Sequence, residues 1–249
     1  MPATSHHITH AGGHPAPSSF VAALHREAEP AMQLPLTEAP LPQAGPDGRA
    51  LIAFGNDFTE VERHDLDGDS WIEVMPGLIR EPGPLFTQLL RDLDWSQRQR
   101  WIYDRKVDEP RLTADYPRIE TAPGSALRLL ARRLSDVYGI PYDGVWVNLY
   151  RNERDSTGWH GDWITCKRDI CTVPVLTLGH PRRFLIKPRG GGRSTRFLPQ
   201  SGDLIVMRGR CQADWRHAVP KQAVPAGPRI SVNFQSTFQM TPATTGDNS

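Results

Sequence analysis

The sequence predicts an α+β protein in which two helices precede an antiparallel β-sandwich or barrel. Leucines recur at helical spacing in two segments, one beginning near Pro84 and one spanning residues 126–137. After Pro141 the pattern changes to short β-rich segments that glycine and proline interrupt. These segments are residues 145–150, 172–178, 183–187, 195–198, 203–207 and 229–238. Helices followed by a run of short strands are typical of this class.

The chain is expected to hold one domain behind a leader. Its 249 residues are enough for one substantial hydrophobic core. Residues 1–48 are rich in Pro, Ala, Gly, Ser and Thr and show neither helical nor strand periodicity, so we expect them to be disordered. Residues 49–249 are then expected to form the single folded domain.

Composition predicts a cytoplasmic protein without a membrane partner. No stretch approaches the roughly 20 apolar residues that span a bilayer, and no secretory signal is recognisable. We take a monomer as the expected state. The three cysteines, Cys166, Cys171 and Cys211, are an odd number without CxxC spacing. This argues against a disulfide framework and a structural zinc site, so we expect reduced thiols.

One short segment has the spacing of a metal site. His160 and Asp162 are two residues apart, and in an extended chain such neighbours point to the same side. A second imidazole, His217, follows later in the chain. Two histidines and one carboxylate leave three positions of an octahedral ion open, as a non-haem Fe(II) oxygenase requires. Such residues also serve as hydrogen-bonding loop residues, so this spacing alone is also compatible with chance.

The last strand carries polar side chains on one face. Arg229, Ser231, Asn233 and Gln235 alternate with apolar residues. A guanidinium that points into a barrel is costly unless it meets an anion, and its fork suits a carboxylate. A dicarboxylate cosubstrate would satisfy Arg229, whereas a surface salt bridge is the alternative. Asn148 and Tyr150 share a face in the same way and would offer donors to the same ligand.

The order of these motifs resembles the AlkB family of Fe(II)- and 2-oxoglutarate-dependent dioxygenases. The resemblance covers roughly Pro110 to Phe238. In chain order its motifs are NLY, HGD, a strand ending in LG, PRRF, GDLIVM, a Trp and a His, and PRIS. The resemblance implies a double-stranded β-helix, or jelly roll, as the core behind supporting N-terminal helices.

The resemblance also implies a cofactor site. Iron would be bound by His160, Asp162 and His217, and 2-oxoglutarate would chelate the iron while its far carboxylate pairs with Arg229. Asn148 and Tyr150 would steady the cosubstrate, beside Ser231 and Gln235.

In that family O2 is used to oxidise a methyl group on a nucleobase nitrogen, with release of formaldehyde, succinate and CO2. Alkylated DNA or RNA would be the partner, and the target base usually leaves the stack to be held by aromatic side chains. The candidate substrate contacts are His160 itself, Tyr116, Arg111 and Trp159. For Tyr116, an ordinary packed tyrosine is the alternative.

The sequence departs from the family pattern at two places. Gln235 stands where family members commonly have a second arginine, so we expect weaker 2-oxoglutarate binding. Trp163 and Ile164 follow Asp162 where acidic residues are usual, and this leaves the base preference open.

A basic segment from Arg182 to Arg196 contains three consecutive glycines and predicts a hairpin. Arg189 and Arg193 are its candidate phosphate contacts, with a solvated loop as the alternative. Two other functions stay open: a hydroxylase or demethylase of a protein or small molecule on the same core, and a non-catalytic binding module.

Overall fold

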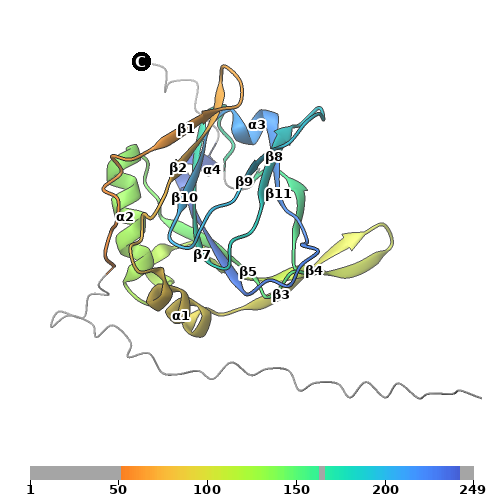
Figure 1. Ribbon diagram of the computed structural model, residues 1–249, viewed down its shortest axis with the longest axis horizontal. Helices are drawn as coiled ribbons and strands as arrows, with labels where there is room; N and C mark the ends of the chain where they lie inside the picture. The colour runs from red at the N-terminus through yellow and green to blue at the C-terminus, as the bar shows by residue number, and fades with distance from the viewer. Residues whose placement is uncertain (1–51, 163–165, 242–249) are drawn as a thin grey trace, which may run out of the picture. The chain divides into compact units, whose positions relative to one another are not determined.

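Two antiparallel sheets face each other in the computed structural model, which describes residues 52–162 and 166–241 (Figure 1). Within these residues the larger sheet has eight strands. In spatial order they are β1 (Glu62–Asp65), β2 (Ser70–Met75), β10 (Leu204–Gly209), β7 (Cys171–Gly179), β12 (Arg229–Gln235), β5 (Gly144–Tyr150), β4 (Arg105–Tyr116) and β3 (Ser96–Ile102). The smaller sheet contains β6 (Thr157–His160), β11 (Trp215–Val219), β8 (Phe184–Pro188) and β9 (Thr195–Phe197). This arrangement confirms the predicted α+β class with a jelly-roll core.

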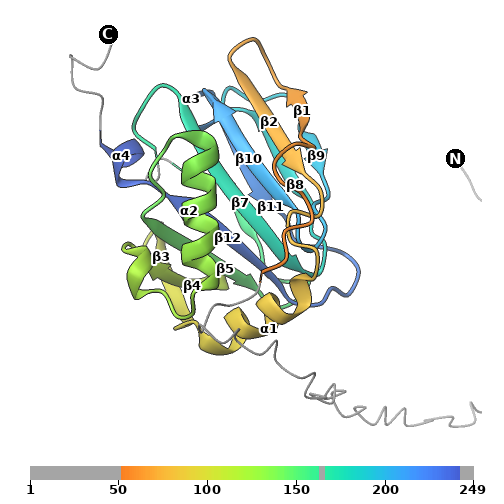
Figure 2. The same ribbon diagram turned by 90° about the vertical axis from the view of Figure 1, so that its left-hand side faces the viewer.

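Two helices cover the outer face of the larger sheet (Figure 2). They are α1 (Pro82–Asp92) and α2 (Ala126–Tyr138), close to the predicted positions. Their leucines pack against the outward-facing apolar residues of β5, β7, β10 and β12. Helix α2 ends where Gly139 takes a left-handed conformation with φ 65°, which glycine adopts without the Cβ clash of other residues.

Side-chain alternation divides the interior into two layers. On β12, Ile230, Val232 and Phe234 belong to the core under the helices. Arg229 and Ser231 therefore face the space between the two sheets. A second apolar cluster fills part of that space with side chains from both sheets. The remainder is a cavity, which the polar face of β12 borders.

The edge hairpin of β3 and β4 was not predicted from the sequence. Its strands are mostly polar and show no apolar alternation. Their pairing is irregular, because Gln97 is opposite Leu112 whereas Gln99 is opposite Asp108. Pro110 lies within this irregularity, where the missing backbone N–H costs no ladder hydrogen bond.

The end of β12 also differs from the prediction. The strand stops at Gln235, and the short helix α4 (Thr237–Met240) follows. The backbone N–H of Thr237 donates to the Asp143 carboxylate at 2.9 Å, which turns the chain away from the sheet. Two other short helical segments lie in connections. The segment η1 (Ile119–Thr121) lies between β4 and α2, and α3 (Cys211–Asp214) lies between β10 and β11.

The expected state of the cysteines was wrong for two of them. Cys166 and Cys171 form a disulfide, because the intervening segment folds back and brings their Cα atoms to 6.1 Å. The absence of CxxC spacing does not exclude a bridge that closes such a short loop. Cys211 is a buried free thiol, as expected.

Two expectations fall on residues that the structure does not describe: the leader of residues 1–48, and the positions of Trp163 and Ile164. Across the described ranges, no helix has the length and apolar character needed to cross a membrane.

Candidate active site

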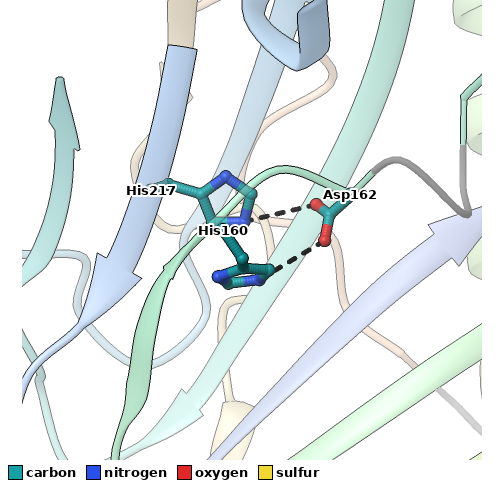
Figure 3. Close-up of side chains that lie close together, drawn as sticks. All are labelled: His160, Asp162 and His217. Carbon is teal, nitrogen blue, oxygen red and sulfur yellow. Dashed lines mark ion pairs between the residues drawn. The ribbon is translucent and has the colours of Figure 1, made fainter. Parts of the chain in front are cut away.

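His160, Asp162 and His217 converge between the sheets (Figure 3). His160 ends β6 and lies directly opposite His217 on β11. Nε2 of His160 is 3.5 Å from Oδ1 of Asp162, and Nε2 of His217 is 3.3 Å from Oδ2 of Asp162. One ligand atom from each of the three lies within 4.8 Å of the others. This is the donor set expected of a two-histidine, one-carboxylate metal centre.

The Asp162 carboxyl is held in the charged form that a metal ion requires. Burial raises the pKa of the Asp162 carboxyl, but the neighbouring imidazoles outweigh burial and hold that pKa well below its usual range. Burial lowers the pKa of His160, and the Asp162 carboxylate reverses this, so the net pKa is raised. Nδ1 of His160 lies 2.8 Å from the Gly158 carbonyl oxygen. A proton on Nδ1 would leave the Nε2 lone pair available to a metal.

Gln212 joins the two segments that carry the ligands. It lies on α3, directly before β11, and its buried Oε1 accepts a hydrogen bond from the backbone N–H of Asp162 at 2.7 Å. A Cβ at Gly161 would lie 3.3 Å from the Gln212 carbonyl oxygen, which is tight. The sequence alone does not single out Gln212, because the contact joins residues 50 positions apart.

A cavity of about 490 Å³ connects the three side chains with the polar face of β12. The register aligns residues of β12 and β5 along its wall: Arg229 lies opposite Tyr150, and Ser231 opposite Asn148. All four expected cosubstrate contacts besides Arg229 line this cavity, namely Asn148, Tyr150, Ser231 and Gln235.

Arg229 has the features of an anion-binding group. Its side chain lines the cavity although the residue is only 2% exposed. Nη2 donates to Oγ1 of Thr177 at 3.0 Å. Nε and Nη1 have no acceptor among the described residues. Burial lowers the pKa of Arg229 to about 10. A buried guanidinium with two unused donors fits a carboxylate ligand, which would compensate its charge.

The neighbouring polar groups form a connected network. Oδ1 of Asn148 accepts hydrogen bonds from Nε of Arg111 and from Nε1 of Trp146, both at 2.9 Å. Nδ2 of Asn148 lies 3.4 Å from Oγ of Ser231. The Tyr150 hydroxyl is 2.8 Å from Oγ1 of Thr157. Both the amide oxygen and the amide nitrogen of Asn148 therefore have partners, which fix the orientation of this side chain.

The structure places the expected substrate contacts Arg111, Trp159 and Tyr116 in three different surroundings. Arg111 lines the cavity and forms a 2.9 Å ion pair with Glu109. Trp159 is partly exposed outside the cavity lining, with Nζ of Lys187 4.3 Å from its ring centroid. Tyr116 lies in the hydrophobic core and not in the cavity lining, so the expectation that it contacts the substrate was wrong. Its ring packs in the core under the helices and its hydroxyl accepts the N–H of Asp94.

The basic segment forms the expected hairpin, with β8 paired to β9. Arg189 and Arg193 are exposed in the connection between these strands. Arg182 differs from the expectation of a basic surface: it is 0% exposed, and its guanidinium donates to the carbonyl oxygens of Asn152, Asp155 and Pro220. It holds loops together and is unable to contact phosphate.

Comparison with known proteins identifies the family. The model of the 2OG-Fe(II) oxygenase superfamily matches residues 80–235. Alpha-ketoglutarate-dependent dioxygenase alkB homolog 3 from Bos taurus and that from Homo sapiens are each 31% identical over 193 residues, covering 69% of this chain and 68% of theirs.

Two other similarities are more distant. DNA oxidative demethylase ALKBH2 from Arabidopsis thaliana is 28% identical over 120 residues, covering 39% of this chain and 38% of its own. The solved structure of OsALKBH1 superposes with a TM-score of 0.51 and 13% identity, covering 70% of this chain and all of that one, which supports the fold alone. The chain therefore belongs to the AlkB family of Fe(II)- and 2-oxoglutarate-dependent dioxygenases.

Proposed function

We propose that this dioxygenase removes methyl groups from ring nitrogens of bases in DNA or RNA by oxidation, with release of formaldehyde, succinate and CO2. One observation carries the proposal: the cavity that contains the His160, Asp162 and His217 side chains also contains the unpaired donors of Arg229. The printed names of the relatives, an alkB dioxygenase and a DNA oxidative demethylase, support the choice of substrate.

In this proposal each residue has a separate task. His160, Asp162 and His217 would hold Fe(II), and Gln212 would fix the backbone that carries Asp162. Arg229 would bind the far carboxylate of 2-oxoglutarate. Four further polar residues would border the same ligand, namely Asn148, Tyr150, Ser231 and Gln235.

Bound iron and 2-oxoglutarate would supply the oxidation of a C–H bond by O2, coupled to decarboxylation of 2-oxoglutarate. The chain supplies a partly apolar enclosure through Val175, Phe184 and Met207, which line the cavity and restrict water. Phe184 also stacks on the His217 ring, with centroids 5.5 Å apart, and limits the rotation of that imidazole.

The surface around the hairpin of β3 and β4 favours a single-stranded partner. The hairpin projects beyond the sheet (Figure 1). It carries Trp101, 67% exposed, and Tyr103, 99% exposed, beside the cations Arg105 and Lys106. Exposed aromatic rings with adjacent cations suit stacking on unpaired bases and contact with phosphates.

Succinate formation tests the proposal when it is measured with and without an N-methylated oligonucleotide. We expect the oligonucleotide to stimulate succinate formation and to release formaldehyde in equal amount. Succinate formation that no methylated oligonucleotide stimulates would favour a protein or small-molecule substrate on the same core. No succinate under any condition would favour a non-catalytic binding module.

A further inference from the structure

The disulfide between Cys166 and Cys171 lies close to the metal-ligand set and has no role in the function proposed above. Cys166 follows Asp162 by four residues, and its backbone N–H donates to the Asp162 carbonyl oxygen at 3.2 Å. Cys171 is the first residue of β7, which lies between β10 and β12 in the larger sheet. The bridge therefore ties the segment that follows Asp162 to a strand of the larger sheet.

The loop that the bridge closes also holds α4. The backbone N–H of Lys167 donates to the Gln239 carbonyl oxygen at 2.9 Å, and Nε of Arg168 donates to the Phe238 carbonyl oxygen at 3.0 Å. Directly after the bridge, the buried Gln239 amide forms two hydrogen bonds with the backbone of Thr172. Its Oε1 accepts the N–H at 2.7 Å, and its Nε2 donates to the carbonyl oxygen at 2.9 Å. The position of α4 therefore depends on this loop.

Helix α4 borders the same cavity as the metal-ligand side chains. Its last residue, Met240, lines the cavity. Gln235, which also lines the cavity, ends β12 shortly before α4 begins. The bridge is thus connected to the cavity at two places, at Asp162 through one backbone hydrogen bond and at Met240 through the contacts of α4.

The bridge constrains the chain only locally. Residues 167–170 lie between the two cysteines, and the effect of a disulfide on the unfolded chain is smallest for such short loops. The cysteines are 1% and 2% exposed, whereas three of the four intervening residues are exposed and none belongs to a helix or strand. Local opening of this loop would expose the sulfurs while both sheets stay folded.

The bond can be exchanged with external thiols in two steps. A thiolate of a dithiol attacks one sulfur of the bridge, which breaks the S–S bond and forms a mixed disulfide. The second thiol of the reductant then attacks this mixed disulfide and leaves with the first as a disulfide. Two electrons and two protons pass to the chain, so that Cys166 and Cys171 become thiols. A disulfide oxidant reverses both steps.

We infer that Cys166 and Cys171 form a reversible thiol–disulfide switch that controls metal binding through the Asp162 segment and the position of α4 at the cavity. The oxidised bridge holds both segments in the arrangement described above. Reduction releases the loop, so α4 loosens and metal affinity falls. The inference rests on the metal site of the proposed function and concerns its regulation.

The test compares the oxidised and the reduced full chain. Wild-type protein is reduced with dithiothreitol, desalted without oxygen, and titrated with Mn(II) in competition with a chelator. We expect the oxidised protein to bind Mn(II) about tenfold more tightly than the reduced protein, because a partner that orients the ligand segment is lost on reduction. Reoxidation with glutathione disulfide should restore the tighter binding. Equal affinity in the two states would overturn the inference.

Two alanine variants provide matched controls. Cys166→Ala is unable to form the bridge and should have the affinity of the reduced protein whatever the treatment. Cys211→Ala removes the buried free thiol, keeps the bridge and should respond to reduction as the wild type does. A redox response in Cys166→Ala, or a wild-type response that Cys211→Ala abolishes, would assign the effect to another thiol and overturn the inference.

Hydrogen exchange separates a local switch from a general loss of stability. The amides of Lys167 and Thr172 both donate to Gln239, and we expect them to exchange about tenfold or more faster after reduction, while amides of β5 stay unchanged. Equal acceleration in β5, or no acceleration at Lys167 and Thr172, would contradict the switch. Absence of Mn(II) binding in both redox states would instead contradict the metal site of the proposed function.

Discussion

Replacing Arg229 by methionine is expected to stabilise the ligand-free protein while it removes 2-oxoglutarate binding. The Arg229 guanidinium is buried; its Nη2 donates to Thr177, whereas Nε and Nη1 have no acceptor among the described residues. Its pKa is lowered from 12.5 to about 10 by burial. Because the folded-state pKa is depressed, the penalty for holding the charge is present at every pH below about 10, including neutral pH.

The size of the effect follows from these contacts. The depressed pKa corresponds to a penalty of about 3 kcal/mol, and the lost hydrogen bond to Thr177 costs about 1 kcal/mol. Methionine is similar in length and carries no charge, so we expect a net gain of about 2 kcal/mol in the free energy of unfolding. For a domain of this size that gain raises Tm by about 4–8 °C.

Thermal melting with Mn(II), with and without 2-oxoglutarate, measures both effects. The wild type should gain about 2.7 kcal/mol when the cosubstrate is present at 100 times its Kd, and Arg229→Met should gain nothing at the same concentration. A melting temperature below that of the wild type without cosubstrate, or a retained response to 2-oxoglutarate, would refute the reasoning.

Arg182→Met is the matched control, because Arg182 is equally buried but donates to three carbonyl oxygens. Its removal deletes all three hydrogen bonds, of which only the one to Asn152 leaves an acceptor with another donor among the described residues, the Asp155 N–H, and it should destabilise the protein by on the order of 3 kcal/mol. The increment in stability that 2-oxoglutarate produces should stay as in the wild type.

Three further substitutions test other parts of the site. Gln235→Arg adds a charged donor to the cavity and should tighten 2-oxoglutarate binding about tenfold or more by calorimetry, and an unchanged or weaker Kd would contradict this. Gln212→Met removes the acceptor for the Asp162 N–H and should weaken Fe(II) binding about 10- to 100-fold, measured in competition with a chelator. Gln212→Glu keeps an oxygen acceptor and should lose less Fe(II) affinity. Equal losses of Fe(II) affinity in the two variants would argue against this role of Gln212. Replacing Arg189 and Arg193 together by glutamine should reduce the slope of log K against log salt for single-stranded DNA by about 1.4, and an unchanged slope would exclude phosphate contact at these positions.

The sequence predicted the elements whose side chains alternate between an apolar and a polar environment. Helices α1 and α2 and strands such as β5 and β12 were recognisable because each buries one regular face. The β3–β4 hairpin was missed because it lies at the sheet edge with mostly polar residues, so burial imposes no pattern on it.

The site was predictable where it depends on local spacing. An HxD pair in an extended segment brings both side chains to one point, and alternation on β12 places Arg229 in the interior. Tyr116 failed as a substrate contact because side chains alternate along β4: its neighbour Asp115 faces the cavity, and Tyr116 faces the core. The position of Arg98, whose guanidinium carbon lies 3.9 Å from the centroid of the Trp146 ring, depends on irregular strand pairing, which has no local sequence signal.

Anaerobic titration of Fe(II) with 2-oxoglutarate, followed by the weak metal-to-ligand charge-transfer absorption in the visible, tests the central claim most directly. The wild type should develop this absorption, and His160→Ala, which removes one of the three converging side chains, should not. No absorption in the wild type at saturating cosubstrate, or an equal absorption in His160→Ala, would contradict a 2-oxoglutarate-chelated iron centre at His160, Asp162 and His217.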